Sequence, residues 1–431
     1  MKRIYIRWLF IIVPALAPAL IWWLAKPAAI QLQSTSEWID AAAKLAGLIA
    51  LSLLAVNIII SARLKLLDRI FFGLDNMYRT HHLTGGWVII FLLIHSGLLT
   101  LKFSLISLAS GYQFLLPSSD IPLTIAKMTL VAMTGLVVLT MYFTIRYEWF
   151  IIAMRLLGAA IFFGGFHAFF VGSSDLRAIK PLLAYMIILG SLAAGLYTYR
   201  SVFRRALHRP YDYLVDEVIN HSAITEVWLK PIDGAMQRFA GQFCYVSFPG
   251  RSMAAEVHPF TISSGSSDRR VRFCMKHVGD YTTSLDTLTV GDPARLEGPY
   301  GNFSFTKAHR LHQVWISGGI GITPFLAMAR SLDSSLHHHI TLYYIIRNKN
   351  EAIFLNELEA ISKQQPNFKV LPVFTYIQGR PKASDYLAGT NAKHTDFLVC
   401  GPAGMLKTVR QQLLAETVPR NCIFTEEFVL S

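Results

Sequence analysis

The sequence predicts a multi-domain membrane protein, with a six-helix transmembrane bundle, then an antiparallel β-barrel, then an α/β domain built on a parallel sheet. Hydrophobic residues make up 53% of the 431 residues and charged residues only 16%, which excludes a wholly soluble or a disordered chain. The apolar residues form long runs before residue 200. Beyond it, short alternating runs give way to strands that alternate with helices.

Six apolar stretches are each long enough to cross a bilayer, which takes about 20 helical residues. They cover roughly residues 8–25, 39–61, 83–102, 121–145, 149–172 and 181–199. The first has the basic start of a signal peptide, but its apolar core is too long and further spans follow it. Lys and Arg gather before span 1, between spans 2 and 3, around the start of span 5 and after span 6. The positive-inside rule therefore predicts a multi-pass protein of the cell membrane with both termini cytoplasmic.

The net charge of +13 does not indicate nucleic-acid binding, because much of it lies between the apolar runs, where it sets membrane orientation. We therefore expect membrane lipid as a partner and no nucleic acid. The cysteines all lie in the soluble half and form no C-x-x-C pair: Cys244, Cys274, Cys400 and Cys422. This usage predicts neither a disulfide framework nor a zinc site.

The soluble half divides into two predicted domains. From about residue 212, alternating runs at 224–229, 243–248, 271–275 and 294–297, punctuated by Gly and Pro, predict a small antiparallel barrel. After about residue 310, strands at 313–317, 340–346, 369–376 and 396–400 alternate with helices at 324–332, 352–363 and 403–416. That alternation predicts a parallel nucleotide-binding sheet. The expected domains are thus 1–209, 210–308 and 309–431.

A glycine-rich turn follows the first strand of the parallel sheet, in Trp315-Ile316-Ser317-Gly318-Gly319-Ile320-Gly321-Ile322-Thr323-Pro324. Glycines let the backbone approach a pyrophosphate, and the following helix start supplies N–H groups. Cys400-Gly401-Pro402-Ala403 ends a later strand of the same sheet. Since open α/β sheets bind ligands at the carboxyl ends of their strands, both motifs are expected to face one crevice. The alternative is a pair of ordinary strand–helix turns.

Three upstream motifs complete an ordered set. They are His258-Pro259-Phe260-Thr261-Ile262-Ser263-Ser264, Lys276-His277-Val278-Gly279-Asp280-Tyr281-Thr282 and Gly298-Pro299-Tyr300-Gly301. With the two turns, residues 212–431 resemble the ferredoxin–NADP reductase superfamily, specifically its NADPH oxidase and ferric reductase branch. That branch carries H-P-F-T where soluble relatives carry R-x-Y-S.

The resemblance implies FAD and NAD(P)H as cofactors. The residues implied to bind FAD are His258, Pro259, Phe260, Thr261, Ser263, Lys276, Gly279 and Thr282. Those implied to bind NAD(P)H are Gly318, Gly319, Gly321, Thr323, Pro324, Gly401 and Pro402, with Cys400 and Phe428 at the site of hydride transfer. The family usually ends in an aromatic residue over the flavin ring; Phe428 matches, although three residues follow it.

Arg347 follows the second strand of the parallel sheet, where a ribose 2′-phosphate would be met. It favours NADPH as the coenzyme; the alternative is a solvated cation at a strand end. The tract His337-His338-His339 has no acidic or cysteine companion. We interpret it as a surface loop.

Histidines in the apolar half are the other feature of note, because ionisable residues within a bilayer are uncommon and usually functional. His81, His82 and His95 occur around span 3, and His167 lies in span 5. His81 and His95 are 14 residues apart, about 21 Å along one side of a helix. Two stacked haems need such an arrangement; the alternative is a set of hydrogen-bonded core histidines.

This segment also resembles the ferric reductase transmembrane domain, whose third span carries H-x-x-x-G and then a second histidine. Here these are His81 to Gly85, then His95. The resemblance implies haem iron ligation by His81, His95 and His167. Met154 stands where span 5 usually has its first histidine, so it is the candidate fourth ligand, with His82 as an alternative.

The sequence therefore predicts a transmembrane flavocytochrome oxidoreductase. Electrons would pass from cytosolic NAD(P)H, preferentially NADPH, through FAD and one or two haems b to a small-molecule acceptor outside, either ferric iron or dioxygen. The alternative is a membrane electron-delivery subunit that reduces a redox protein partner. A six-span transporter fused to a reductase is a third, more distant reading.

Overall fold

The computed structural model describes residues 2–25, 33–62, 64–71, 74–143, 145, 147–170, 174–203, 210–249, 256–333 and 337–427. The chain divides into two compact units, Met1–Arg209 and Pro210–Ser431.

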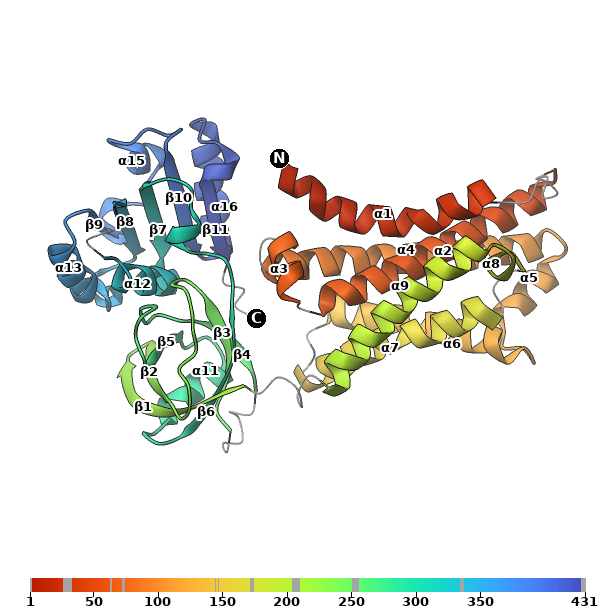
Figure 1. Cartoon of the computed structure of the whole chain (residues 1–431), viewed down its shortest axis with the longest axis horizontal. Coiled ribbons are helices and arrows are strands. Elements are labelled where there is room, and N and C mark those ends of the chain that lie inside the picture. The colour runs from red at the N-terminus through yellow and green to blue at the C-terminus, as the bar shows by residue number, and fades with distance from the viewer. Residues whose placement is uncertain are drawn as a thin grey trace. The chain divides into compact units, whose positions relative to one another are not determined.

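The first unit is a bundle of helices (Figure 1). Within the described residues, six helices are long and apolar enough to cross a membrane, which confirms the six predicted spans. They are α1 (Lys2–Ala25), α2 (Thr35–Ser61), α4 (Leu74–Ser104), α6 (Ile121–Tyr142), α7 (Tyr147–Phe170) and α9 (Lys180–Thr198). The shorter helices α3 (Lys65–Phe71), α5 (Leu108–Leu115) and α8 (Ser174–Ala178) lie in the connections, and a π-helical turn (Tyr199–Phe203) follows α9.

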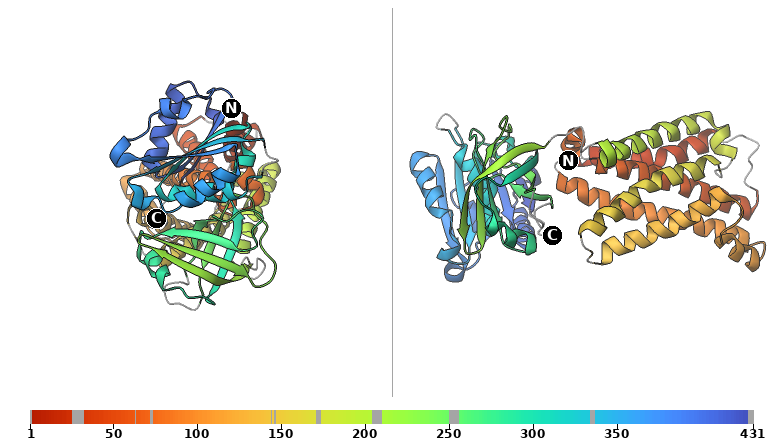
Figure 2. Two further views of the ribbon diagram at one scale, coloured as in Figure 1. Left: turned by 90° about the vertical axis from the view of Figure 1, so that its left-hand side faces the viewer. Right: turned by 90° about the horizontal axis from the view of Figure 1, so that it is seen from below.

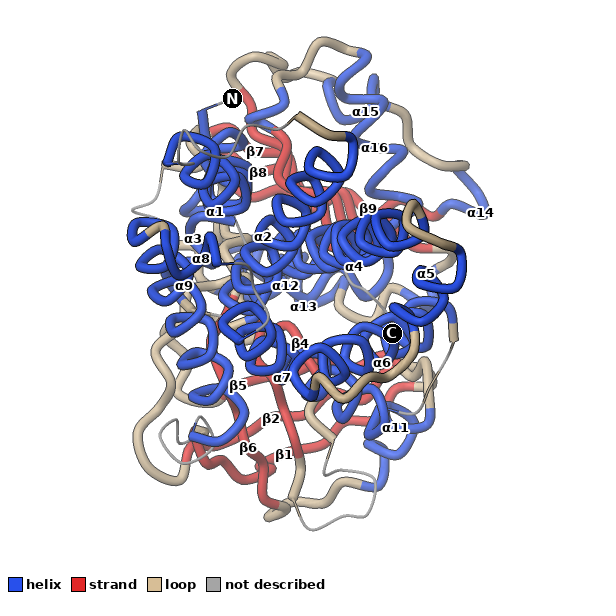
Figure 3. Tube along the Cα trace, turned by 90° about the vertical axis from the view of Figure 1, so that its right-hand side faces the viewer, coloured by secondary structure: helices blue, strands red, loops and turns tan. Residues whose placement is uncertain are grey.

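Helix α2 is the centre of this bundle. It packs against α1, α4, α7 and α9, is the most buried of the six, and is seen roughly end-on in Figure 3. Its buried alanines, including Ala43, Ala46 and Ala50, let neighbouring helices approach closely. Asp40 in its first turns lies 2.5 Å from the Lys102 ammonium near the end of α4, so α2 and α4 run antiparallel.

Local sequence explains how these helices begin and how an interruption is repaired. Ser34 and Glu37 form a capping box at the start of α2, and Asp120 caps α6. In α1, Pro18 has no N–H to donate to the carbonyl of Pro14. The Tyr185 hydroxyl of α9 donates to that carbonyl instead, at 2.7 Å. An unpaired carbonyl in an apolar bundle would be costly, so this bond links α9 to α1.

The second unit begins with an antiparallel sheet of six strands among the described residues, seen with the second sheet in Figure 2. Its order is β4-β3-β6-β1-β2-β5. The bounds are β1 (Tyr211–His221), β2 (Ile224–Pro231), β3 (Phe243–Ser247), β4 (His258–Thr261), β5 (Val271–Lys276) and β6 (Pro293–Tyr300). The two edge strands meet where Ile262 bridges Phe273, so the sheet curls into the predicted barrel.

A parallel sheet of order β11-β10-β7-β8-β9 follows. Its strands are β7 (His312–Gly318), β8 (His339–Ile346), β9 (Phe368–Phe374), β10 (Thr395–Gly401) and β11 (Ile423–Glu427), and the helices around it include α12 (Thr323–Arg330), α13 (Leu355–Gln364) and α16 (Ala403–Ala415). Barrel and parallel sheet share one apolar core, in which Ile224 and Cys274 of the barrel lie with Trp315 and Phe325.

The predicted elements hold with a few differences. The pattern missed β1, β4 and β11, although β1 pairs with its neighbour β2 as well as with the distant β6. It also continued the third parallel strand to residue 376, whereas Thr375–Gln378 forms the short helix α14. The Gln378 side chain accepts from the Phe374 N–H at 2.7 Å, which caps the strand end and turns the chain away.

Arg238 organises the segment between β4 and β5. Its side chain is only 7% exposed, and its Nη2 lies within hydrogen-bond distance of Ser264 Oγ and of the carbonyls of Gly265, Asp268 and Arg270, at 2.7–3.1 Å. A buried cation therefore satisfies backbone groups that no sheet partner reaches.

We expect Arg238→Met to destabilise a 210–431 fragment by about 2–3 kcal/mol, because buried carbonyls lose their donor, and to lower its Tm by about 4–12 °C. Thermal unfolding followed by circular dichroism measures the change. Arg295→Met is the control, since Arg295 and its partner Asp212 are both more than half exposed and such pairs contribute little. Equal Tm values for the two variants would contradict the assignment.

Candidate functional site

The strand order of the parallel sheet places the two glycine turns side by side. Chain order reverses between β7 and β10, which pair directly. In open α/β sheets this reversal opens a crevice at the carboxyl ends of the strands. Gly318 ends β7 and leads into a 3₁₀ turn (Gly319–Ile322), while Gly401 ends β10.

The two turns are in close backbone contact, which explains their glycines. A Cβ added at Gly321 would lie 2.5 Å from the carbonyl oxygen of Cys400, so no larger residue fits without displacing β10. Gly319 has φ +55°, in the left-handed region that favours glycine. At Gly318 a Cβ would meet the flexible Met405 side chain, which could move. The backbone contact at Gly321 is therefore the one that requires glycine.

The predicted residues beside the turns are mostly buried. Thr323 is 2% exposed and its hydroxyl donates to the carbonyl of Ile320 at 3.1 Å. Pro324 is buried at the start of α12, whereas Pro402 is exposed. Cys400 is fully buried, and burial raises the pKa of its thiol, which keeps it protonated. Its role in hydride transfer stays a prediction.

On the barrel side, the His258–Thr261 motif forms the edge strand β4. The ring of His258 lies 4.0 Å from that of Tyr281, and the ring of Phe260 stacks on Tyr281 at 6.4 Å. His258 Nε2 is 2.7 Å from a carboxylate oxygen of Glu256. Pro259 is exposed and Thr261 is buried on the same strand. Together these rings form one aromatic face, a surface suited to a planar ring system.

Tyr281 is the residue of this cluster that sequence reasoning did not select. It is buried, burial raises the pKa of its hydroxyl, and that hydroxyl has no hydrogen-bond partner in the described structure. An orphaned buried hydroxyl is a group that a bound ligand can satisfy. Tyr281 lies within the Lys276–Thr282 motif, which was the available signal. Its contact with His258 could not be predicted, because the fold alone brings the two residues together.

The remaining predicted FAD residues differ in how free they are. Lys276 is the exposed last residue of β5, and Gly279 precedes the short helix α11 (Asp280–Ser284). Thr282 Oγ1 accepts from the N–H of Gly279 at 3.2 Å. Ser263 is fully buried and donates to the carbonyl of Arg272 at 3.0 Å, so its hydroxyl is already used. Its contact with FAD stays a prediction, and Phe428 lies outside the described residues.

Arg347 follows β8 at the carboxyl edge of the sheet, as predicted. Its side chain is 66% exposed, and its Nε lies 3.9 Å from a carboxylate oxygen of Glu351. An exposed pair at this distance is weak. The guanidinium is therefore available to a ligand, with an acidic side chain beside it.

In the helical unit, two of the predicted histidines make the same contact with α2. His81 Nδ1 lies 3.2 Å from the carbonyl of Asn57, and His95 Nδ1 lies 2.7 Å from that of Ala43. Both pairs are 14 residues apart on antiparallel helices, so the contact repeats after about 21 Å. Each imidazole then keeps Nε2 free for another partner.

The ring of His167 on α7 faces that of His95, with centroids 6.4 Å apart and the planes at 70°. Its Nδ1 is buried without a hydrogen-bond partner in the described structure. Gly47 of α2 provides the space for the His95 ring, since a Cβ there would lie 2.9 Å from His95 Nδ1. No described cluster of three His, Cys, Asp or Glu side chains could hold a metal ion, so this site is a histidine pair.

Met154 and His82 are not drawn into such a pair. Met154 is half-buried on α7 and His82 is exposed on α4, and no hydrogen bond or ring contact joins either side chain to that of His81 in the described structure. Asn57 was not selected from the sequence, yet its amide donates to the carbonyl of His81 at 2.7 Å and to Thr84 Oγ1 at 2.6 Å. An asparagine inside an apolar run was the signal that could have identified it.

Comparison with known families gives two matches, one after the other. Residues 220–318 match the FAD-binding domain model and residues 315–411 match the oxidoreductase NAD-binding domain model. These ranges contain the aromatic face on β4 and both glycine turns.

Curated relatives cover the same half. The reductase component of propane 2-monooxygenase from Mycolicibacterium smegmatis is 27% identical over 222 residues, 48% of this chain and 63% of that protein. Sulfhydrogenase 1 subunit gamma from Pyrococcus furiosus is 30% identical over 188 residues, 40% of this chain and 62% of that protein. The chain thus spans less than two thirds of the length of these relatives.

A solved flavohemoglobin from Malassezia yamatoensis, with bound FAD and heme, matches over 92% of this chain and 99% of its own, with a TM-score of 0.51 and 17% identity. This likeness is one of fold alone. The two domain matches carry the identification. The chain therefore carries an FAD-binding and an NAD-binding domain, which form an NAD(P)H-dependent flavin reductase module, and six candidate membrane-spanning helices.

Proposed function

We propose that this protein is a transmembrane flavocytochrome of the NADPH oxidase and ferric reductase type. It would take electrons from NADPH on the cytoplasmic side and deliver them through FAD and haem b to an acceptor on the other side. The observation that carries the proposal beyond the reductase module is the His95–His167 pair in the helical unit.

The separation of this pair would let both imidazoles bind one haem iron, since their ring centroids are 6.4 Å apart. The contact of His95 Nδ1 with a backbone carbonyl is the outer contact that metal-bound histidines usually have. His95 and His167 would therefore hold haem iron near the end of α4 that carries Lys102.

His81 has the same outer contact with α2, so it is the natural ligand for a second, inner haem. Its partner is less well defined. Fourteen residues before His167, on the same side of α7, stands Ala153; Met154 is rotated from His167 by about 140° on an ideal helix. Met154 would ligate only if α7 were locally distorted, with His82 as the other candidate. We thus propose one haem at His95 and His167. A second haem, if bound, would have His81 as one of its ligands.

The soluble half supplies binding and orientation. When bound there, FAD would supply the chemistry that converts hydride transfer from the nicotinamide into single electrons for haem. The aromatic face of His258, Phe260 and Tyr281 would hold the flavin side, with Lys276 available to the negatively charged phosphates. The backbone of Gly318–Ile322 would cradle the coenzyme pyrophosphate.

The acceptor is either ferric iron or dioxygen, since the motifs are common to both branches of the family. The alternative, an electron-delivery subunit that reduces a partner protein, shares every cofactor and differs only in the acceptor. Ferric reduction and superoxide release by the purified protein, with and without oxygen, separate the three. We place the protein in the cell membrane with both termini cytoplasmic, on the distribution of Lys and Arg.

The soluble module alone is expected to bind FAD and to oxidise NADPH with an artificial acceptor. A fragment that starts at residue 210 contains both matched domains and their shared core. Ferricyanide reduction with added FAD measures the activity. A folded fragment that binds no FAD and shows no such activity would contradict the reductase assignment.

Arg347→Ala is expected to raise the KM for NADPH about 10-fold or more, because the 2′-phosphate loses a charged hydrogen bond, and to change that for NADH less than about 2-fold. Lys369→Ala is the control, since that exposed cation lies near the amino end of β9, away from the crevice. The neighbouring Glu351 carboxylate could bind the free 2′-hydroxyl of NADH, which would favour the other coenzyme. If Arg347→Ala affects both coenzymes equally, the predicted NADPH preference is wrong.

His95→Ala and His167→Ala are each expected to remove one haem per chain and to stop electron delivery to outside acceptors while leaving ferricyanide reduction by the module intact. The pyridine haemochrome assay, expressed as haem per FAD, measures the loss. Ser96→Ala is the control next to His95. Full haem content in both histidine variants would refute the site, and a further loss in His81→Ala would reveal an inner haem.

A further inference from the structure

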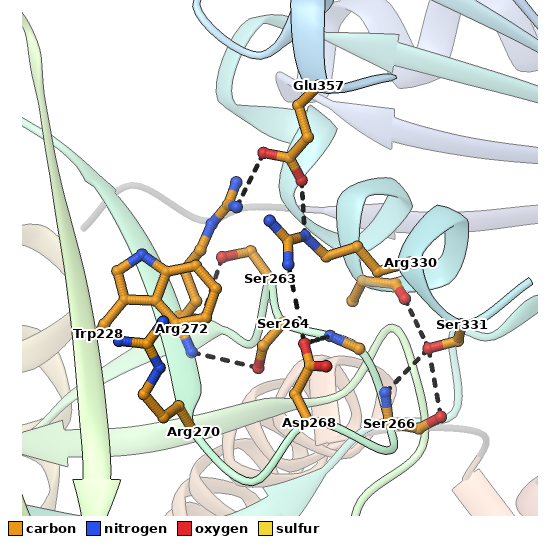
Figure 4. Close-up of polar contacts among 12 residues, drawn as sticks. Trp228, Ser263, Ser264, Ser266, Asp268, Arg270, Arg272, Arg330, Ser331 and Glu357 are labelled. Carbon is orange, nitrogen blue, oxygen red and sulfur yellow. Dashed lines mark hydrogen bonds and ion pairs between the residues drawn. The ribbon is translucent and has the colours of Figure 1, made fainter. Parts of the chain in front are cut away.

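A partly buried cluster of charges joins the barrel to the parallel-sheet domain within the second unit (Figure 4). Glu357, on α13 of the parallel-sheet domain, lies between two arginines. One carboxylate oxygen is 2.9 Å from Arg272 Nη1 on β5 of the barrel, and the other is 2.6 Å from Arg330 Nε at the end of α12. The single carboxylate thus binds one cation from each domain.

On the barrel side, the cluster contains a buried arginine and an aromatic ring. Arg272 is 1% exposed and its Nε lies 3.5 Å from Glu226. The indole of Trp228 lies against three guanidiniums, with Arg270 at 4.6 Å, Arg330 at 5.3 Å and Arg272 at 5.4 Å from the ring centre. Arg330 comes from the other domain, so this stack crosses the same boundary.

The segment between β4 and β5 adds a second connection. Ser266 contacts Ser331 Oγ through its N–H at 2.9 Å and through its hydroxyl at 3.2 Å. Asp268 lies 3.9 Å from Arg330 Nη1. Because the buried Arg238 fixes this segment from inside, it is a rigid surface against which the parallel-sheet domain rests.

The cluster lies at the far end of the helix that begins at the coenzyme turn. Helix α12 starts at Thr323, directly after the glycine turn, and ends at Arg330, a length of about 12 Å. A contact that fixes Arg330 therefore fixes the direction of the turn relative to the barrel. Hydride transfer needs the reacting atoms about 3–3.5 Å apart and aligned, so small shifts between two domains cost rate.

We propose that the Arg272–Glu357–Arg330 cluster is an alignment device, which holds the NAD(P)H domain in register with the FAD barrel for hydride transfer. Glu357 is a positioning residue, since it lies on α13 and outside the glycine turns and the aromatic face. The inference rests on the proposed NADPH-to-FAD transfer. The cofactor motifs would bind FAD and NAD(P)H, whereas this ion-pair cluster would align the two domains that carry them.

The charges suit such a role. Burial alone would raise the pKa of Glu357, but Arg272 and Arg330 outweigh it and hold the pKa below its usual value, so the carboxylate is ionised. A buried ion pair is weak evidence for stability, because desolvation opposes it, and its best-attested use is to fix register. Loss of Glu357 would leave Arg272 with only the more distant Glu226.

The test is Glu357→Gln in the full-length protein in detergent, loaded with FAD. Stopped-flow absorbance at saturating NADPH is expected to show flavin reduction slowed about 10- to 100-fold, with unchanged FAD affinity. The primary isotope effect with 4-deuterated NADPH should rise, since the hydride step becomes limiting; a merely structural defect would leave it unmoved. Glu357→Asp, which keeps the charge, should recover part of the rate.

Glu359→Gln is the matched control, an exposed glutamate two residues further along α13. If Glu357→Gln and Glu359→Gln both reduce flavin at the wild-type rate with the wild-type isotope effect, the alignment role is refuted. If Glu357→Gln fails to fold, Arg330→Met, which removes the same contact from a partly exposed side chain, must show the slow step and raised isotope effect, or the proposal falls. A wild-type protein that oxidises no NADPH would refute the proposed function instead.

Discussion

The contact between the backbones of Gly321 and Cys400 is the constraint on which the soluble half depends. A Cβ at Gly321 would lie 2.5 Å from the Cys400 carbonyl oxygen, so β7 and β10 can end side by side only with glycine there. That closeness puts the start of α12 at the point where strand order reverses, which makes the crevice. The 3₁₀ turn also touches β5 of the barrel, so the same constraint brings the two predicted cofactor sites together.

The helical unit depends on a different constraint, the repeat along α2. Carbonyls of Ala43 and Asn57 meet His95 and His81 after the same 14-residue interval, because α2 and α4 are antiparallel and straight enough to stay in register. Only α7 departs from this repeat. It carries His167 opposite His95, but Ala153 stands 14 residues earlier, where a partner for His81 would be expected. The bundle is thus built for two equivalent histidine positions but supplies a complete pair at only one.

Much of this fold follows from local sequence. Hydropathy alone located the spans, because a bilayer fixes their length, and glycine turns after strands located the crevice. What could not be predicted needs pairing over long distances. Tyr281 meets His258, Asn57 meets His81 and Glu357 meets Arg272 only after folding, across 23, 24 and 85 residues. Hydrophobic periodicity carries no information on such long-range contacts. In the sequence, Glu357 is simply a polar position of an amphipathic helix.

These hidden residues share one principle, and the two halves apply it differently. Each contacts a residue of another element, Tyr281 through its ring and Asn57 and Glu357 through hydrogen bonds, since a group in position matters more than one merely present. Among the helices the partners of the histidines are backbone carbonyls and an amide, which carry no charge and so avoid the desolvation that a buried ion would suffer. Between the two soluble domains the partner is the Glu357 carboxylate, with 26% of its side chain exposed. Water there reduces the cost of desolvating the charge. A hydrogen-bonded carboxylate–guanidinium pair also fixes direction as well as distance. The choice of partner therefore follows from the local dielectric, which explains why charges pair at the boundary between the soluble domains and uncharged groups pair among the helices.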